Sequence, residues 1–298
     1  MISEKCKGDT LNAKAFAPAH ITGFFETHDH QNPVMKGSTG CGIVLNAGIE
    51  STVTAGEGIQ KSEIMLNGKK VSGNTISTVI EIITDMPVKV QCQADIPVEC
   101  GLGASGAGAL STAYALNSAL SLNLTANKLN EIAHVAEVRN SSGLGDVAAQ
   151  SVGGVVIRTV PGAPDSGKYD HIPGPELDVY CLTLGKLSTG SVLGNAELLG
   201  RINYTGRKAM EKLMQKPTIA EFMACSRDFC IDTGLADERI IDIIETVEAA
   251  GGMASQAMLG NTVFAISNNP EEETVQQALT EFGNVLHYKT SFTSIRII

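Results

Sequence analysis

Residues 96–110 read IPVECGLGASGAGAL, and the glycines of this stretch decide how the rest of the chain is interpreted. Gly101, Gly103 and Gly106 have the spacing G-x-G-x-x-G, which is typical of the phosphate loop of dinucleotide-binding enzymes. Such a loop needs a buried strand that ends at its first glycine and an acidic residue about 20 residues further on, which holds a ribose. The question is whether the surrounding sequence supplies both.

The surrounding sequence supplies neither feature. The preceding apolar segment stops at Pro97, and no Asp or Glu occurs between Glu99 and Glu131. What remains is a glycine-rich loop that enters a long helix, and the backbone N–H groups and dipole of such a helix start form an anion site. The alternative is that these small residues only let a helix pack closely against a sheet. A dehydrogenase is therefore the least favoured interpretation.

Composition places the chain among ordinary globular proteins with one large or two medium domains. The 298 residues carry 22 Lys and Arg against 32 Asp and Glu, and there is no Trp and no basic run, so a nucleic-acid partner is not expected. The seven Cys are odd in number and include no C-x-x-C pair, which indicates reduced thiols. The polar N-terminus and interrupted apolar runs predict no export signal and no membrane span, and hence a cytoplasmic protein.

The first hundred residues are expected to be mostly β. A short strand over 14–20 should run into a loop, followed by strands over 42–55, 63–71 and 87–96 in an antiparallel sheet, with Asn67-Gly68 as a hairpin turn. Helices are predicted over 104–122 and 126–140, the second with Thr125 as its N-cap. A continuous strand follows in GGVVIRTV.

A Pro- and Gly-rich cluster, PGAPDSGKYDHIPGPELD, predicts a boundary between two domains, 1–165 and 166–298. The second half has the pattern of a strand, three helices, a strand, a helix after Pro270 and a final β segment. The helices are expected over 194–215, 218–231 and 237–249. This order predicts an α+β domain and not a repeating β-α-β array.

Two acidic residues follow the glycine-rich segment. His134 and Glu137 lie three residues apart, on one face of the predicted helix, and Asp146 lies in a glycine-flanked turn nine residues after Glu137. Phosphoryl transfer needs a phosphate cradle, oxygen ligands for Mg²⁺ and an acidic residue that orients the attacking hydroxyl. Ser105, Glu137 and Asp146 are residues of the right types, although two acids can equally be exposed surface groups.

At this point the sequence resembles the GHMP kinases, a family that includes galactokinase and the homoserine and mevalonate kinases. PVECGLGASGAGAL resembles the family's phosphate-loop motif, and SGLGDVAAQSVGG resembles the segment with its catalytic acid. AFAPAHITGFFE and GGMASQAMLGNTVFAI match its first and third motifs. The resemblance implies an α+β fold, with an N-terminal domain like ribosomal protein S5 domain 2 and a C-terminal α+β, ferredoxin-like domain.

The resemblance also implies roles for individual residues. Ser105 and Glu137 match the metal ligands, Ser105 also a phosphate ligand, and Asp146 matches the catalytic aspartate. The residues expected at the ATP phosphates are Gly101, Leu102, Gly103, Ala104, Ser105, Gly106 and Ala107. The sequence departs from the family where Ala104 replaces a serine, and where His20 replaces a lysine that helps to orient the aspartate.

Within the family, the sequence is most similar to an archaeal branch that phosphorylates pantoate, an acid, on the route to coenzyme A. This resemblance implies Mg²⁺ and ATP, a homodimer, and a small-molecule acceptor. The expected acceptor contacts are His20, His134, Arg158 and Thr189, because a carboxylate calls for a cation and hydroxyl donors. Arg158 interrupts an apolar strand and needs an anion, which a structural salt bridge would also provide. The alternatives are another small acceptor, of the homoserine or mevalonate type, and a catalytically silent regulatory protein.

Overall fold

The computed structural model describes residues 10–186, 195–267 and 274–298. Its first sheet contains β1 (Leu11–His28), β2 (Gly37–Ala55), β3 (Glu63–Leu66), β4 (Lys69–Lys70), β5 (Val88–Ala94), β6 (Val155–Val160), β7 (Lys168–His171) and β12 (Arg296–Ile297). The order is β12-β1-β2-β5-β3-β4, and β6 and β7 extend the sheet from the other part of β2. All pairs are antiparallel except β3 with β5, so the predicted antiparallel sheet is largely confirmed.

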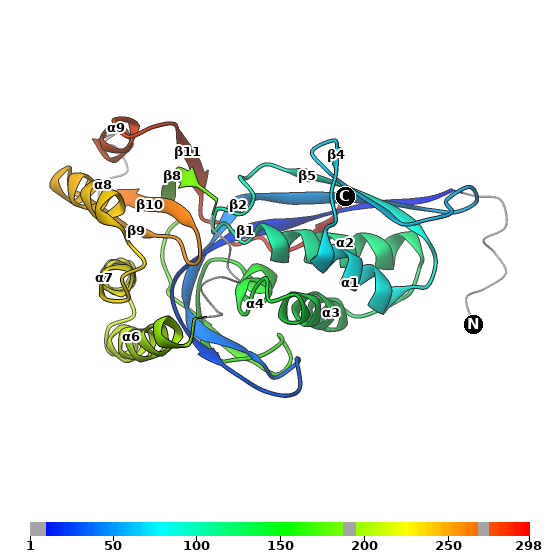
Figure 1. Ribbon diagram of the computed structural model, residues 1–298, viewed down its shortest axis with the longest axis horizontal. Helices are drawn as coiled ribbons and strands as arrows, with labels where there is room; N and C mark the ends of the chain where they lie inside the picture. The colour runs from blue at the N-terminus through cyan, green and yellow to red at the C-terminus, as the bar shows by residue number, and fades with distance from the viewer. Residues whose placement is uncertain (1–9, 187–194, 268–273) are drawn as a thin grey trace.

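The strands β1 and β2 form one long hairpin. The prediction of a short strand that ends at His20 was therefore wrong. The two strands pair from Leu11 to His28, with irregularities after Pro18 and Thr22. Proline and glycine suggested a break there, but a bulge bends a strand without ending it. Figure 1 shows both blue strands curving past α4 (Asp146–Val152). The bend carries His20 underneath the glycine-rich loop.

Helices cover one face of the first sheet (Figure 1). They are α1 (Asn74–Ile83), α2 (Ala104–Ala119), α3 (Ala126–Arg139) and α4. The predicted cap of α3 is confirmed, since the Thr125 side chain accepts a hydrogen bond from the Lys128 N–H. The helix α1 was not predicted, because its mostly β-branched sequence NTISTVIEII has strand propensity. It is helical because Thr75, Val79 and Ile80 form one buried face that packs against α2 and α3.

The second sheet has the order β11-β8-β10-β9 and is packed against helices (Figure 1). Its strands are β8 (Asp178–Gly185), β9 (Gly252–Gln256), β10 (Asn261–Ser267) and β11 (Val285–Lys289), and the helices are α6 (Ala196–Gln215), α7 (Ile219–Asp232), α8 (Glu238–Ala249) and α9 (Thr274–Thr280). The three predicted helices of this half agree with α6, α7 and α8 to within two residues. The α+β fold class is confirmed.

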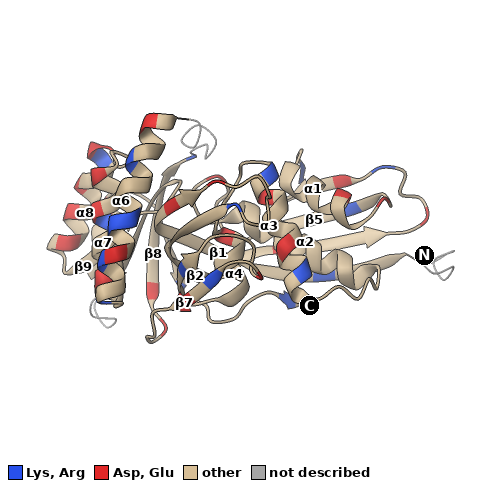
Figure 2. Cartoon of the chain, turned by 90° about the horizontal axis from the view of Figure 1, so that it is seen from below, with Lys and Arg blue, Asp and Glu red and all other residues tan. Residues whose placement is uncertain are grey.

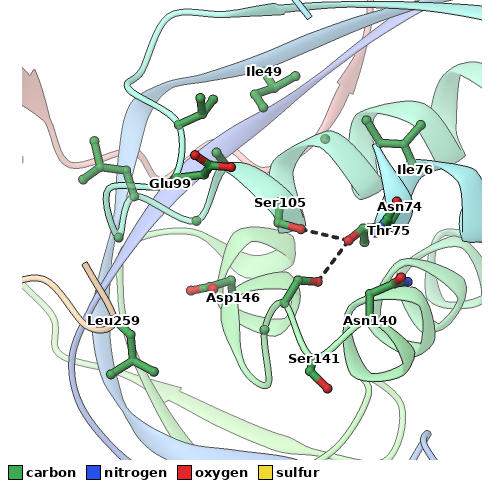
Figure 3. A pocket seen from close by; sticks show the side chains of 18 of the residues that line it. Ile49, Asn74, Thr75, Ile76, Glu99, Ser105, Asn140, Ser141, Asp146 and Leu259 are labelled. Carbon is green, nitrogen blue, oxygen red and sulfur yellow. Dashed lines mark hydrogen bonds between the residues drawn. The ribbon is translucent and has the colours of Figure 1, made fainter. Parts of the chain in front are cut away.

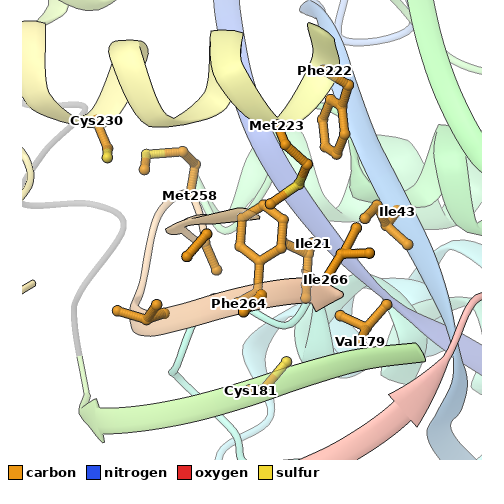
Figure 4. Packing of buried hydrophobic residues seen from close by; sticks show 14 of the residues in the cluster. Ile21, Ile43, Val179, Cys181, Phe222, Met223, Cys230, Met258, Phe264 and Ile266 are labelled. Atoms are coloured by element: carbon orange, nitrogen blue, oxygen red, sulfur yellow. The ribbon is translucent and has the colours of Figure 1, made fainter. Parts of the chain in front are cut away.

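One hydrophobic cluster contains residues of both halves. Ile21 from β1 and Ile43 from β2 lie in the same buried cluster as Phe222, Met223 and Phe264 from the second half, as Figure 4 shows. The strands β7 and β12 lie after residue 165 in the sequence but pair in the first sheet. The division at 165/166 stays a prediction, and the buried cluster joins the two halves directly.

The outer surface of the second half carries charges of both signs. Figure 2 shows acidic and basic residues intermixed along α6, α7 and α8, where Arg227 pairs with Asp228 and Glu248, and Lys212 with Glu221. No helix among the described residues has both the length and the apolar composition that crossing a bilayer requires.

Candidate active site

A cavity of about 940 Å³ opens where the starts of α1, α2 and α4 meet the turn between β9 and β10. Figure 3 shows Thr75, Ser105 and Asp146 around it, with Leu259 from the second half on one side. Ser105, Asp146 and Arg158 all line this cavity, together with loop residues of 101–104. Residues from all four predicted motifs thus line one cleft, from Thr22 in the first to Leu259 in the third.

The glycine-rich loop has the conformation that a phosphate cradle needs. Gly101 and Gly103 have φ angles of 88° and 65°, in the left-handed region that favours glycine. Helix α2 begins at Ala104 with Gly103 as its N-cap, and no side chain caps the first turn. The first backbone N–H groups of α2 are therefore available to an anion at the positive end of the helix dipole.

Contacts from three other segments hold this loop in place. The backbone N–H of His20 donates to the Leu102 carbonyl at 3.2 Å, and Gln150 Nε2 donates to the Gly103 carbonyl at 2.8 Å. Gly260, in the turn after β9, packs so closely against Gly101 that a Cβ at either position would collide with the other. Such anchoring preorganises the loop for its ligand.

Glu137 lies buried beside Ser105 and Asp146. Its Oε1 accepts a hydrogen bond from Ser142 Oγ at 2.7 Å, while its buried Oε2 has no partner among the described residues. Burial and, to a smaller extent, the Asp146 carboxylate raise the pKa of Glu137 to about 7, against the hydrogen bond from the Ser142 hydroxyl, which lowers it. A buried carboxylate is stable as an ion only when it is paired, so Oε2 is an atom at which a cation could bind.

The residues present fit Mg²⁺. Glu137 Oε2 and Ser105 Oγ are hard oxygen donors at the edge of the phosphate cradle, and Mg²⁺ is usually held by one or two carboxylates together with phosphates and water. No group of three or more His, Cys, Asp or Glu side chains that could hold a metal occurs in the described part of the chain. The fit is therefore to a nucleotide-bound ion and not to an all-protein site.

Asp146, the first residue of α4, is oriented by His20. His20 Nδ1 lies 2.7 Å from Asp146 Oδ1, and the imidazole is buried. Burial lowers the pKa of His20, and the hydrogen bond and charge of Asp146 oppose this shift. Because an ionised carboxylate only accepts, Nδ1 carries the proton. His20 thus contacts the aspartate, as expected for the residue in the place of the family lysine.

Arg158, on β6, is buried behind the same aspartate. Its Nε and Nη1 atoms have no hydrogen-bond partner among the described residues, and no ion pair to it is found there. A Cβ at Gly145, the residue before Asp146, would lie 2.6 Å from Arg158 Nε. Burial lowers the pKa of Arg158, and the nearby Asp146 charge opposes this shift. A structural salt bridge to Arg158 thus finds no partner among the described residues, and the guanidinium, which lines the cavity, can bind an anion there.

Two of the predicted acceptor contacts, His20 and His134, do not line the cavity. His134 is buried outside the cavity lining, and its Nε2 lies 2.8 Å from the Lys36 carbonyl oxygen, where it holds the connection between β1 and β2. Burial lowers the pKa of His134. Thr189 lies outside the described residues, so its role stays a prediction.

Three polar residues of the site were missed by the sequence analysis. They are Thr75, Ser142 and Gln150, which bridge the predicted residues to one another. Gln150 carried a usable signal, because it follows Asp146 by one helical turn and so shares its face. Ser142 follows Glu137 by five residues in a predicted turn, and Thr75 had no signal.

The sequence is similar to those of known kinases. The chain matches the family model described as "GHMP kinases N terminal domain" over residues 70–154 and the model "GHMP kinases C terminal" over residues 209–285. A pantoate kinase of Methanocaldococcus jannaschii is 37% identical over 275 residues, covering 90% of this chain and 97% of the relative. A pantoate kinase of Thermococcus kodakarensis is 32% identical, with 91% and 92% covered.

The solved structures agree with these matches. One described as a phosphotransferase related to the coenzyme A biosynthesis pathway superposes with a TM-score of 0.88 at 29% identity, covering 97% of this chain and 99% of the other. A homoserine kinase of Cytophaga hutchinsonii has a TM-score of 0.73 at 17% identity, covering 100% and 99%, which shows a shared fold alone.

Proposed function

The chain belongs to the GHMP kinase family, and we propose that it transfers the γ-phosphoryl group of ATP to the primary hydroxyl of pantoate. The bond between the γ-phosphorus and the β,γ-bridging oxygen breaks, a bond from the pantoate oxygen forms, and the hydroxyl proton is released. The products are ADP and 4-phosphopantoate. The 37% identity to a pantoate kinase over 90% of the chain supports this acceptor.

The loop residues 101–107 and the start of α2 bind the phosphates of ATP. Ser105 and Glu137 hold Mg²⁺, which neutralises phosphate charge when it is bound. Asp146 contacts the pantoate hydroxyl through Oδ2, because His20 occupies Oδ1. Phosphoryl transfer requires little covalent chemistry from the protein. The main contribution of the protein is therefore to position the acceptor hydroxyl, held at Asp146, against the γ-phosphoryl group.

The observation that carries the choice of an acid acceptor is the unpaired guanidinium of Arg158 beside Asp146. A buried guanidinium without an anion is costly, and a carboxylate provides two acceptor oxygens in the plane of its donors. An acceptor that is bound by its carboxylate at Arg158 presents its far end to Asp146. Homoserine and mevalonate are also acids, so Arg158 favours an acid acceptor without choosing among the three.

A phosphorylation assay with a panel of acceptors tests this proposal. The purified protein is supplied with ATP and Mg²⁺, and with pantoate, pantothenate, homoserine or mevalonate, and ADP formation is followed. Turnover with pantoate alone supports the proposal. Turnover with another acceptor contradicts the proposed acceptor but supports the kinase activity. If none of the acceptors is phosphorylated, a catalytically silent regulatory protein is favoured. The homodimer and the cytoplasmic location stay predictions, and gel filtration with light scattering tests the first.

A further inference from the structure

A chain of hydroxyl groups joins the two proposed metal ligands. Ser105 Oγ lies 3.1 Å from Thr75 Oγ1, Thr75 Oγ1 lies 3.0 Å from Ser142 Oγ, and Ser142 Oγ lies 2.7 Å from Glu137 Oε1. Figure 3 draws the two bonds made by Thr75, which connect the start of α1 with the start of α2 and with the turn after α3. Three segments that are distant in sequence are thus linked by one threonine.

The direction of the hydrogen bonds in this chain follows from its carboxylate end. An ionised Glu137 only accepts, so Ser142 donates its single proton to Oε1. Thr75 must then donate to Ser142, and Ser105 must donate to Thr75. Because each hydroxyl has one proton, the carboxylate fixes the orientation of all three.

With this direction of hydrogen bonding, both proposed ligands have lone pairs available to a cation. The Ser105 proton is turned toward Thr75, so the lone pairs of Ser105 Oγ are left for the cavity. Glu137 uses Oε1 for Ser142 and keeps Oε2 without a partner. A neutral hydroxyl coordinates a cation through a lone pair, and a proton pointing at the ion would repel it.

Thr75 is buried at the start of α1, which fixes the position of its hydroxyl. It is buried, with 7% of its surface exposed, and lies in the first turn of α1, next to Ile76, which packs against α2. The hydrogen bonds of its hydroxyl among the described residues go to Ser105 and Ser142. Thr75 also lines the cavity, so its effect through the metal ligands is separated from a direct contact with the nucleotide by comparing binding with and without Mg²⁺.

We propose that Thr75 and Ser142 are positioning residues that orient Ser105 and Glu137 as ligands of the metal–nucleotide complex. This inference rests on the proposed kinase function but not on the identity of the acceptor. Outer partners of metal ligands typically contribute roughly 10–100-fold to metal affinity. Loss of either hydroxyl should therefore weaken binding of the nucleotide only when Mg²⁺ accompanies it.

Calorimetric titration with AMP-PNP, a non-hydrolysable ATP analogue, tests the inference without an acceptor. Each protein is titrated with excess Mg²⁺ and again with EDTA. We expect T75V, which keeps the shape of threonine without its hydroxyl, and S142A to bind Mg·AMP-PNP about tenfold or more weakly than the wild type. Their affinity in EDTA should stay unchanged. T75S restores the hydroxyl and should bind nearly as the wild type does.

The matched control is S77A, which removes a hydroxyl from the exposed side of α1, where it bonds to Glu81. Equal affinities of the wild type, T75V and S142A for Mg·AMP-PNP would overturn the inference. So would an equal loss with and without Mg²⁺, which indicates a general structural role. If circular dichroism shows that T75V is unfolded, the affinities of S142A with and without Mg²⁺ test the inference. A wild type that binds no Mg·AMP-PNP would overturn the proposed function itself, and this inference with it.

Discussion

His20 Nδ1 lies 2.7 Å from Asp146 Oδ1, and this contact joins the bend of β1 to the first residue of α4. The same His20 donates its backbone N–H to Leu102 in the glycine-rich loop. One residue therefore sets the position of the acidic group relative to the phosphate cradle. A neutral, buried imidazole does this without adding a charge beside the phosphates.

Replacement of His20 should lower the rate of phosphoryl transfer. In H20A, Asp146 loses its donor and can rotate, and a misplacement of about 1 Å at a reacting group can cost about 100-fold. We expect kcat with pantoate to fall by about that factor while the KM for ATP changes little. Steady-state kinetics with each substrate varied in turn measures both.

The variant H20N is the matched control for this prediction. Its amide nitrogen occupies the δ position, as Nδ1 does, and can donate to Asp146 Oδ1. We expect it to recover most of the lost rate. If H20A and H20N lose activity equally, the hydrogen bond to Asp146 does not carry the effect.

Glu137 should make the stability of the metal-free protein depend on pH. Its pKa is raised to about 7, from an ordinary value of 4.5, chiefly by burial. Between these values the folded protein binds a proton that the unfolded chain has lost, so the free energy of unfolding falls as pH rises through this window. The total fall is on the order of 3 kcal/mol, from 1.36 kcal/mol per pKa unit.

Urea denaturation in EDTA from pH 4.5 to 8 measures this dependence. E137Q, which stays neutral, should lack the fall, be more stable than the wild type at pH 8, and be inactive. E131Q is the control on the same helix, where Glu131 pairs at the surface with Lys128, and it should keep the wild-type slope. If E137Q kept the wild-type dependence of stability on pH, ionisation of the Glu137 carboxyl would not be what lowers the stability of the wild type.

The sequence was a good guide where the signal was local. The glycine spacing and the absence of an acidic residue after it predicted a phosphate cradle outside a dinucleotide fold. Arg158 was singled out because a charge in an apolar strand needs a partner, and the cavity is where that partner would bind. Thr125 and the Asn67-Gly68 turn were also predicted correctly, since capping and turn geometry depend on adjacent residues.

Features that depend on distant contacts were not predictable. The β-branched segment 74–83 has strand propensity, and it is helical because it packs against α2 and α3. Thr75 contacts Ser105 across 30 residues and Ser142 across 67, with no periodicity to indicate either contact. The helical spacing predicted that His134 lies on the same face as Glu137 and contacts the acceptor. The His134 ring instead bonds to the Lys36 carbonyl, outside the cavity.

Arg158 should control affinity for the acceptor and not for ATP. In R158M the carboxylate of pantoate loses a charged hydrogen-bonding partner, worth roughly 1.5–3 kcal/mol or about 10–100-fold in KM. Methionine suits the buried position, because replacing a buried charge by an apolar group of similar size is often tolerated. We expect the KM for pantoate to rise by this factor and the KM for ATP to stay within about twofold. Equal rises in both would indicate a general distortion of the site.

Gly106 and Gly108 should respond in opposite ways to the same change. Both lie in α2, where alanine is favoured over glycine by about 0.5–1 kcal/mol. A Cβ at Gly108 would meet only side-chain atoms, the nearest being Ile76 Cδ1 at 3.3 Å, so G108A should be at least as stable as the wild type. A Cβ at Gly106 would lie 2.6 Å from Gln150 Oε1.

G106A should therefore force Gln150 away from the Gly103 carbonyl, at a cost of about 1 kcal/mol for the lost hydrogen bond, and loosen the phosphate loop. We expect G106A to be less stable than G108A in urea and to have a higher KM for ATP than the wild type. Q150L, which removes the same hydrogen bond without adding a Cβ, should raise the KM for ATP in the same direction. A normal KM in Q150L combined with a raised one in G106A would assign the effect to the added methyl group, because the bond from Gln150 would then not be what holds the loop.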